Sequence, residues 1–189
     1  MHVGLYFGSF NPVHVGHLII ANYVVDNAGV DQVWFIVSPQ NPLKPAASLL
    51  NEYHRLFLVK LATENHPKLK VSDIEFKLPR PSYTIDTLIY LQEKYPLHQF
   101  SVIVGSDSYQ NIDKWKNSDV LLKNYSFIVY ERPNHKIENI SPGVKLLKAP
   151  MLDISSTLLR KTIENGKSIR YMVPDNVWEE IEKGGYYKK

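Results

Sequence analysis

Two histidines stand three residues apart in the stretch Gly-Leu-Tyr-Phe-Gly-Ser-Phe-Asn-Pro-Val-His-Val-Gly-His, residues 4–17. The stretch runs from a predicted buried strand into a predicted helix. At a helix start, His14 and His17 face the same side, because residues three apart are neighbours on a helix surface. Two imidazoles beside free backbone amides form a compact donor set that suits a polyphosphate. A metal pair or purely structural histidines are the alternatives, although no cysteine or carboxylate is close in sequence.

A second polar group lies in Ile-Ser-Ser-Thr-Leu-Leu-Arg, residues 154–160. Ser155 or Ser156 can cap a helix that begins here. The amides of that helix start, with the side chain of Arg160 one turn further along, would form a second clamp for phosphate. Taken alone, the stretch is explained more simply as a helix with an ordinary N-terminal cap.

Strands and helices alternate along the chain and must position these groups. A strand at 2–8, a helix at 16–29 and a strand at 32–38 form a βαβ unit, so the two strands should be parallel. Further elements are expected as a helix at 51–65, a strand at 69–76, a helix at 84–95 opened by Ser82 or Thr84, strands at 100–107 and 126–132, a short helix at 118–124, a final strand at 144–150, and helices at 155–167 and 174–185. The order predicts an α/β fold, a Rossmann-like open, mostly parallel sheet with helices on both faces.

Ligands of such sheets bind beyond the carboxyl ends of the strands. The loops that should carry the chemistry are therefore those that follow strands: 8–16, 38–48, 105–115, 131–135 and 150–156.

The composition excludes several classes of protein. The 189 residues contain no cysteine, which removes disulfides and thiolate metal sites. Hydrophobic residues make up 44% and charged residues 22%, values near the average for globular proteins. The net charge is +3, and the lysines and arginines are scattered along the sequence rather than clustered into a basic stripe for nucleic acid. No signal peptide or membrane span is apparent, so we expect a cytoplasmic protein.

Residues 8–17 resemble the Gly-x-Phe-(Asp/Asn)-Pro-x-His-x-Gly-His signature of the HxGH nucleotidyltransferase superfamily, and residues 155–160 resemble its Ser-x-Thr-x-x-Arg signature. The matching positions are Gly8, Phe10, Asn11, Pro12, His14, Gly16, His17, Ser155, Thr157 and Arg160. The two motifs stand at opposite ends of the chain. The resemblance implies a single nucleotidyltransferase domain over 1–189, in which C-terminal helices within 155–183 complete the ATP phosphate site.

The middle of the chain narrows the resemblance. Pro-Ser-Tyr-Thr-Ile-Asp-Thr-Leu, residues 81–88, and Gly-Ser-Asp-Ser-Tyr-Gln-Asn-Ile-Asp-Lys-Trp, residues 105–115, are similar to the nicotinate mononucleotide adenylyltransferase family. The resemblance implies condensation of nicotinate mononucleotide with ATP to nicotinate adenine dinucleotide and pyrophosphate, in NAD biosynthesis. A nicotinamide mononucleotide or dual-specificity adenylyltransferase is the near alternative. A non-catalytic nucleotide sensor is the distant one.

The same resemblance implies a role for each site residue. His14, His17 and Arg160 would be catalytic. ATP would contact Gly8, Ser9, Phe10, Gly16, Gly105, Asp107, Arg132, Ser155, Ser156 and Thr157. The pyridine nucleotide would contact Asn11, Lys44, Tyr83, Thr84 and Trp115, with Tyr83 as pocket wall. Mg²⁺ would bind mainly through ATP phosphates, with few protein ligands, since it keeps its waters. The oligomeric state is left open, with a homodimer as one option.

Overall fold

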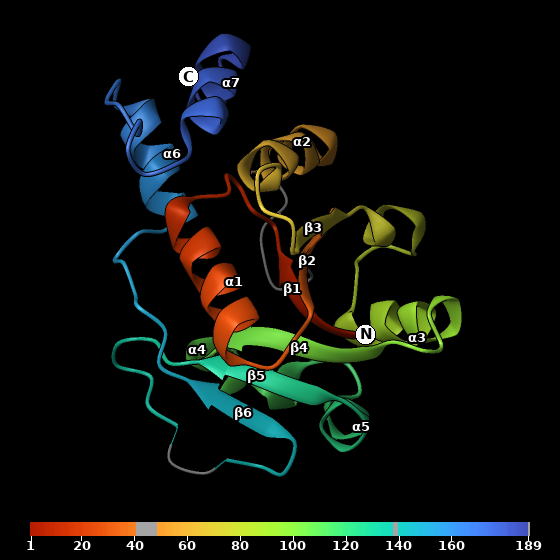
Figure 1. Cartoon of the computed structure of the whole chain (residues 1–189). Helices are drawn as coiled ribbons and strands as arrows, with labels where there is room; N and C mark the ends of the chain where they lie inside the picture. The colour runs from red at the N-terminus through yellow and green to blue at the C-terminus, as the bar shows by residue number, and fades with distance from the viewer. Residues whose placement is uncertain (41–48, 138–139, 189) are drawn as a thin grey trace.

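The computed structural model describes residues 1–40, 49–137 and 140–188, and the described chain folds around a central sheet (Figure 1). The sheet has six strands in the order β3-β2-β1-β4-β5-β6. They are β1 (His2–Gly8), β2 (Gln32–Val37), β3 (Leu69–Ser72), β4 (Gln99–Gly105), β5 (Ser126–Tyr130) and β6 (Val144–Leu147). Every neighbouring pair is parallel. The Rossmann-like α/β prediction is confirmed.

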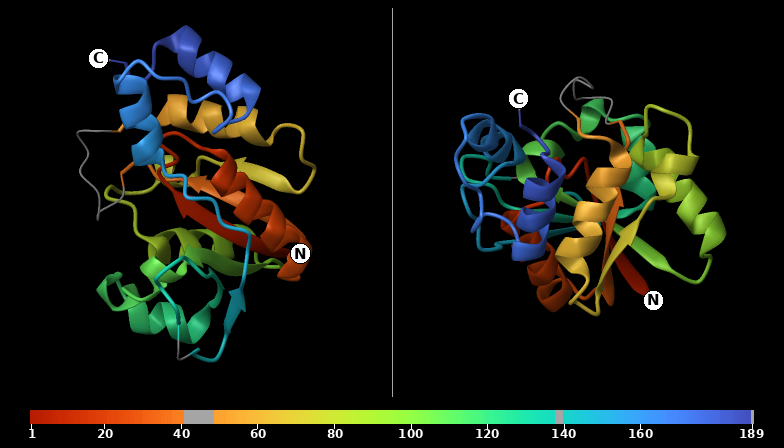
Figure 2. Two further views of the ribbon diagram at one scale, coloured as in Figure 1. Left: turned by 90° about the vertical axis from the view of Figure 1, so that its left-hand side faces the viewer. Right: turned by 90° about the horizontal axis from the view of Figure 1, so that it is seen from above.

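Helices cover both faces of the sheet (Figure 2). One face carries α1 (Val15–Asn27), α2 (Glu52–Thr63), α6 (Ser156–Glu164) and α7 (Asp175–Gly184). The other carries α3 (Thr84–Lys94), α4 (Ser106–Tyr109), α5 (Ser118–Asn124) and the 3₁₀ turns η2 (Ile74–Lys77) and η3 (Ile112–Lys114). Within the described ranges, no helix is long and apolar enough to cross a membrane.

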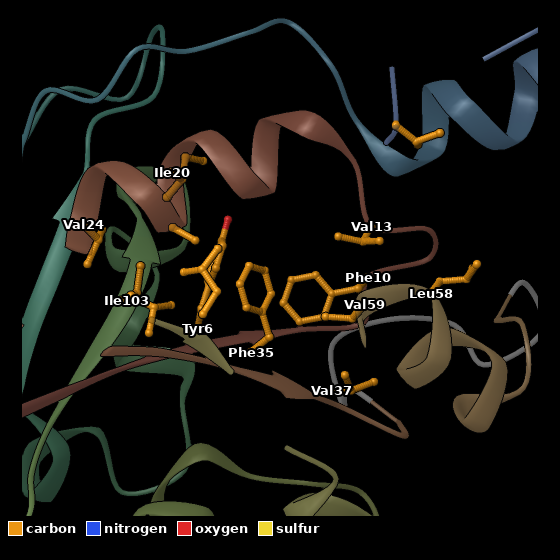
Figure 3. Packing of buried hydrophobic residues seen from close by; sticks show 14 of the residues in the cluster. Tyr6, Phe10, Val13, Ile20, Val24, Phe35, Val37, Leu58, Val59 and Ile103 are labelled. Carbon is orange, nitrogen blue, oxygen red and sulfur yellow. The ribbon is translucent and has the colours of Figure 1, made fainter. Parts of the chain in front are cut away.

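The strands divide their side chains between two cores. Successive residues of a strand point to opposite faces, so Tyr6, Phe35 and Ile103 enter the core under α1 and α2, as Figure 3 shows. Leu5 and Ile36 enter the core under α3 and α5. Strands buried on both sides carry near-continuous apolar runs, which explains why these segments were recognisable in the sequence.

The strand order reverses between β1 and β4. From β1 the chain adds β2 and β3 on one side, then returns to place β4, β5 and β6 on the other. Loops that leave β1 and β4 therefore diverge and leave a crevice at their carboxyl ends. Gly8 ends β1 and Gly105 ends β4, so both glycines stand at this switch point.

The predicted strand at 69–76 is wrong in its second half. Its pairing with β2 stops where Ser72 meets Ile36, because β2 itself ends one residue later, at Val37. With no further strand to pair with, the chain turns at Asp73 into η2.

The helix at 84–95 was predicted to be opened by Ser82 or Thr84, and Thr84 is correct. Thr84 is its first helical residue, and Tyr83 occupies the cap position without a side-chain hydrogen bond. Ser82 lies outside the helix and is buried. The amides at the start of α3 consequently receive no side-chain cap.

Candidate active site

A cleft of about 1030 Å³ opens at the switch point between β1 and β4. It brings together nearly all the residues singled out from the sequence. The lining includes Gly8, Ser9, Phe10, Asn11, His14, His17, Tyr83, Thr84, Gly105, Asp107, Trp115, Arg132, Ser155, Ser156, Thr157 and Arg160. Gly16 is not part of the lining and lies against His14. Lys44 lies outside the described residues.

His14 and His17 stack at the start of α1. Their ring centroids are 3.7 Å apart with an interplanar angle of 30°. The backbone N–H of His14 donates to Nδ1 of His17 at 3.2 Å. Because Nδ1 accepts that bond, a neutral His17 carries its proton on Nε2. The expectation that both histidines share one side of the helix start is confirmed.

Gly16 permits this stacking. A Cβ at this position would lie 3.0 Å from Nδ1 of His14, closer than side chains ordinarily approach. A larger residue would therefore require the His14 imidazole to shift by a few tenths of an ångström.

His14 is only 5% exposed. Burial, with a smaller contribution from the charge of Arg132, lowers the pKa of His14 to about 4. The imidazole is thus neutral at pH 7 and offers one N–H donor rather than two.

The second motif closes the cleft from the C-terminal part of the chain. Ser155 caps α6 by accepting from the N–H of Leu158 at 3.2 Å. Ser156 donates its hydroxyl to the carbonyl of Pro12 at 2.8 Å. Arg160 donates from Nη1 to the carbonyl of Asn11 at 2.8 Å. Of the two capping options, Ser155 is correct, and Ser156 instead ties α6 to the first motif.

The residues between Gly8 and His14 shape the loop. Phe10 is buried at φ 45°, an unusual backbone for a residue with a side chain. Its ring packs edge-on against His17, with centroids 5.1 Å apart. The Asn11 side-chain oxygen accepts from the Leu50 N–H at 3.1 Å and the Tyr187 hydroxyl at 3.0 Å. Both residues hold the loop's shape as well as lining the cleft.

The carboxyl end of β4 carries an ion pair. Nε of Arg132 lies 3.2 Å from Oδ1 of Asp107, and the Arg132 N–H donates to the Ser106 hydroxyl at 2.8 Å. A Cβ at Gly105 would stand 2.5 Å from Oδ1 of Asp107 and 2.9 Å from Nε of Arg132. A residue with a side chain at the end of β4 would therefore displace the ends of the Asp107 and Arg132 side chains from this arrangement.

The start of α3 and the turn after η3 form another wall. Trp115 is half-buried and, with Tyr83, packs against the core under α3. Lys116 places its ammonium 4.7 Å from the centre of the Tyr83 ring and 2.9 Å from Oδ2 of Asp86. Thr84 opens α3 beside these aromatic rings. The wall combines flat apolar surfaces with uncapped helix amides.

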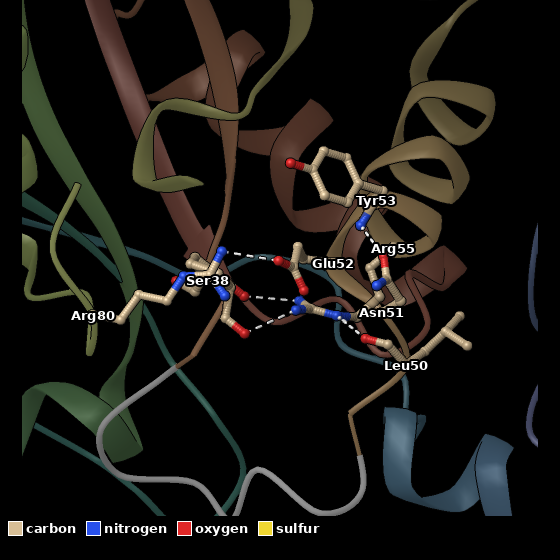
Figure 4. Close-up of polar contacts among 8 residues, drawn as sticks. Ser38, Leu50, Asn51, Glu52, Tyr53, Arg55 and Arg80 are labelled. Atoms are coloured by element: carbon tan, nitrogen blue, oxygen red, sulfur yellow. Dashed lines mark hydrogen bonds and ion pairs between the residues drawn. The ribbon is translucent and has the colours of Figure 1, made fainter. Parts of the chain in front are cut away.

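Arg55 of α2 is a structural residue that sequence reasoning missed. It is fully buried, and its guanidinium donates to carbonyls of Leu50 (2.8 Å), Ser9 (2.6 Å), Ser38 (2.8 Å) and Pro39 (3.1 Å), several of which are drawn in Figure 4. Arg55 thereby joins the loops that leave β1 and β2. An arginine four residues before Val59, on the apolar face of a helix, was the available signal.

Metal ligands do not gather in the described part of the cleft. No group of three or more His, Cys, Asp or Glu side chains among the described residues is placed to hold a metal ion. Asp107, a carboxylate of the lining, is paired with Arg132. The cleft instead offers imidazoles, hydroxyls, a guanidinium and helix amides, a donor set suited to anions.

Comparison with known families agrees with this geometry. Residues 5–162 match the family model described as cytidylyltransferase-like, and the chain belongs to this family. A protein of Flavobacterium psychrophilum named probable nicotinate-nucleotide adenylyltransferase is 50% identical, covering 100% of both chains. One of Cytophaga hutchinsonii with the same name is 48% identical, covering 99% of this chain and 98% of its own. The family resemblance inferred from the motifs is confirmed.

Solved structures share the fold. Nicotinic acid mononucleotide adenylyltransferase of Plasmodium falciparum, complexed with NaAD, superposes with a TM-score of 0.84 at 22% identity, covering 98% of this chain and 97% of that one. The same enzyme complexed with APC gives a TM-score of 0.82, also at 22% identity, with coverages of 98% and 96%.

Proposed function

We propose that this chain is an adenylyltransferase that condenses nicotinate mononucleotide with ATP, giving nicotinate adenine dinucleotide and pyrophosphate in NAD biosynthesis. The observation that carries the proposal is the meeting of the two motifs in one cleft. Arg160, far along the chain, bonds to the carbonyl of Asn11 beside the stacked histidines. The full-length relatives that carry this activity in their names support the choice of substrate.

The reaction is an in-line displacement. An oxygen of the mononucleotide 5′-phosphate forms a bond to the α-phosphorus of ATP, and the bond from that phosphorus to the oxygen bridging the β-phosphate breaks. The electron pair leaves with pyrophosphate. Because the attacking phosphate is already an anion, the protein needs no general base and forms no covalent intermediate. Its contributions are alignment and neutralisation of charge.

The phosphate cradle divides into two sides. His17, with its proton on Nε2, and neutral His14 each donate to the α- and β-phosphates. Arg160, Thr157 and the Ser155 end of α6 hold the β- and γ-phosphates from the facing side. Donors fixed in place before the reaction stabilise the transition state without the cost of reorganisation.

The wall of Tyr83, Thr84 and Trp115 receives the pyridine ring. A pyridinium over an indole face gains about 0.5–2 kcal/mol. The uncapped amides at the start of α3 receive the ring carboxylate. At the opposite side, Asp107 and Arg132 face the adenosine half.

Magnesium would be carried by the phosphates of ATP, because the described residues of the cleft offer anion-binding donors and no cluster of metal ligands. When bound, it would neutralise phosphate charge during transfer.

The direct test compares kcat/KM for nicotinate mononucleotide and nicotinamide mononucleotide, with ATP and magnesium. A strong preference for the nicotinate substrate supports the proposal. A preference for nicotinamide would keep adenylyl transfer and overturn the carboxylate site at α3. Absence of pyrophosphate release with either mononucleotide would favour the sensor.

A further inference from the structure

A buried carboxyl lies behind the pyridine-side wall. Glu75 of η2 is 1% exposed, yet it borders the cleft alongside Ser38, Ser82 and Thr84. No charged partner accompanies it in the described structure: its Oε1 accepts from the hydroxyl of Thr87 at 2.9 Å, and its Oε2 makes no hydrogen bond of ordinary geometry. Burying a carboxyl with half its bonding capacity unused costs stability, so its presence calls for an explanation beyond packing.

Thr87 connects this carboxyl to the first turn of α3. Its hydroxyl lies 2.9 Å from Glu75 and 3.4 Å from the carbonyl of Tyr83, the cap residue of the helix. Thr87 is fully buried. The contact between Thr87 and Glu75 is therefore a buried hydrogen bond that joins the first turn of α3 to η2.

Ser82 approaches the same carboxyl from the segment that leads into α3. Burial raises the pKa of Glu75, and the hydroxyls of Ser38, Thr87 and Ser82 oppose that shift. Of these, Thr87 meets hydrogen-bond geometry, whereas the buried Ser82 hydroxyl makes no such bond within the described chain. Protonation of Glu75 would weaken the electrostatic repulsion between its carboxyl group and the carboxylate of the substrate.

We propose that Glu75 is a positioning residue for the pyridine nucleotide, holding the first turn of α3 through Thr87 so that its amides meet the nicotinate carboxylate. The inference rests on the proposed function and adds a specificity-determining group that does not touch substrate. The proposed role has two chemical requirements. Residue 75 must accept a hydrogen bond from the Thr87 hydroxyl, and it must not place excess negative charge beside the substrate carboxylate.

Steady-state kinetics on the full chain tests this inference, with each substrate varied in turn at saturating concentration of the other. Glu75→Ala removes the acceptor, Glu75→Gln keeps an acceptor without charge, and Thr87→Val removes the donor at nearly constant shape. Asp73→Ala is the matched control, because Asp73 is an exposed neighbour whose side chain makes no cap bond.

Glu75→Ala should raise KM for nicotinate mononucleotide about tenfold, as loss of roughly 1.4 kcal/mol of binding would, with much smaller changes in kcat and in KM for ATP. Thr87→Val should give the same pattern, and the double variant less than the product of the two effects. Glu75→Gln should recover most of the lost affinity, and Asp73→Ala should match the unsubstituted chain.

Three results would overturn the inference while leaving the function intact: an unchanged KM for nicotinate mononucleotide in Glu75→Ala, an equal rise in KM for ATP, or a Glu75→Gln variant no better than Glu75→Ala. Should Glu75→Ala fail to fold, Thr87→Val is judged by the same readout. Failure of the unsubstituted chain to turn over nicotinate mononucleotide would overturn the function, and this inference with it.

Discussion

Arg160 and Asn11 join the two ends of the chain: Nη1 of the arginine donates to the asparagine carbonyl at 2.8 Å, across 149 positions of sequence. A second nitrogen of the same guanidinium lies 3.4 Å from the Thr157 hydroxyl. Arg160 is therefore held in place before any nucleotide arrives. An arginine fork fixed in this way presents its remaining donors toward the cleft in a defined orientation.

Arg160→Lys should lower kcat/KM for ATP roughly tenfold to a hundredfold, since a lysine cannot keep both contacts and bind phosphate with a fork. The thermal midpoint should change little, because Arg160 is only partly buried. Kinetics with varied ATP and a thermal melt check both parts. A variant with unaltered kinetics would show that the guanidinium serves only to dock α6.

His17→Ala should reduce kcat by roughly a hundredfold to a thousandfold, the usual effect of losing one fixed donor to a transition-state oxyanion. Its Nδ1 is held by the His14 N–H, so the donor removed is Nε2–H. His17→Asn keeps a short side chain with a donor and is the matched comparison. Equal loss in kcat and kcat/KM is expected, and a change confined to KM would contradict the assignment.

Trp115→Ala should raise KM for nicotinate mononucleotide while kcat changes little, because a stacking contact binds substrate and transition state alike. Trp115→Phe keeps an aromatic face, so its KM for nicotinate mononucleotide should lie between those of the unsubstituted chain and Trp115→Ala. A fall in kcat alone would rule out the stacking assignment, and Trp115 would then be a packing residue of the core under α3.

The sequence alone predicted most elements and nearly all of the cleft, for identifiable reasons. Strands buried on both faces leave unbroken apolar runs. Within each of the two motifs, the signature residues are close together in sequence. Arg55, Glu75 and Tyr187 escaped because their hydrogen-bond partners lie outside their own elements: Arg55 bonds to carbonyls in loops, Glu75 bonds to Thr87 of α3, and Tyr187 reaches Asn11 across 176 positions. Backbone carbonyls have no side-chain signature, so no pattern in the sequence could pair them.

The neutral His14 predicts a pH dependence of stability. Its folded pKa of about 4 lies below the ordinary value of 6.5. Between these two values His14 is protonated in the unfolded chain and neutral in the folded chain. The free energy of unfolding therefore rises with pH through this window. The part due to His14 is fully present above 6.5 and lost as pH falls toward 4. Its size is on the order of 3 kcal/mol.

Urea unfolding at intervals from pH 4 to 7 measures this slope. Replacing His14 by glutamine removes the titrating group, so the slope should flatten even where the variant is less stable overall. An identical slope in both proteins would show that other groups set the acid sensitivity.

Arg55→Met should lower the free energy of unfolding by about 3 kcal/mol or more, because hydrogen bonds from a charged donor are worth about 1.5–3 kcal/mol each and the buried carbonyls would lose their partner. The carbonyls of Ser9 and Ser38 belong to the loops after β1 and β2.

Arg55→Lys tests whether charge alone suffices. A single ammonium cannot serve acceptors spread over three guanidinium nitrogens, so most of the loss in the free energy of unfolding should remain. Urea unfolding of both variants decides the matter, and a lysine variant as stable as the unsubstituted chain would mean that the buried charge, and not the geometry of the fork, holds the loops.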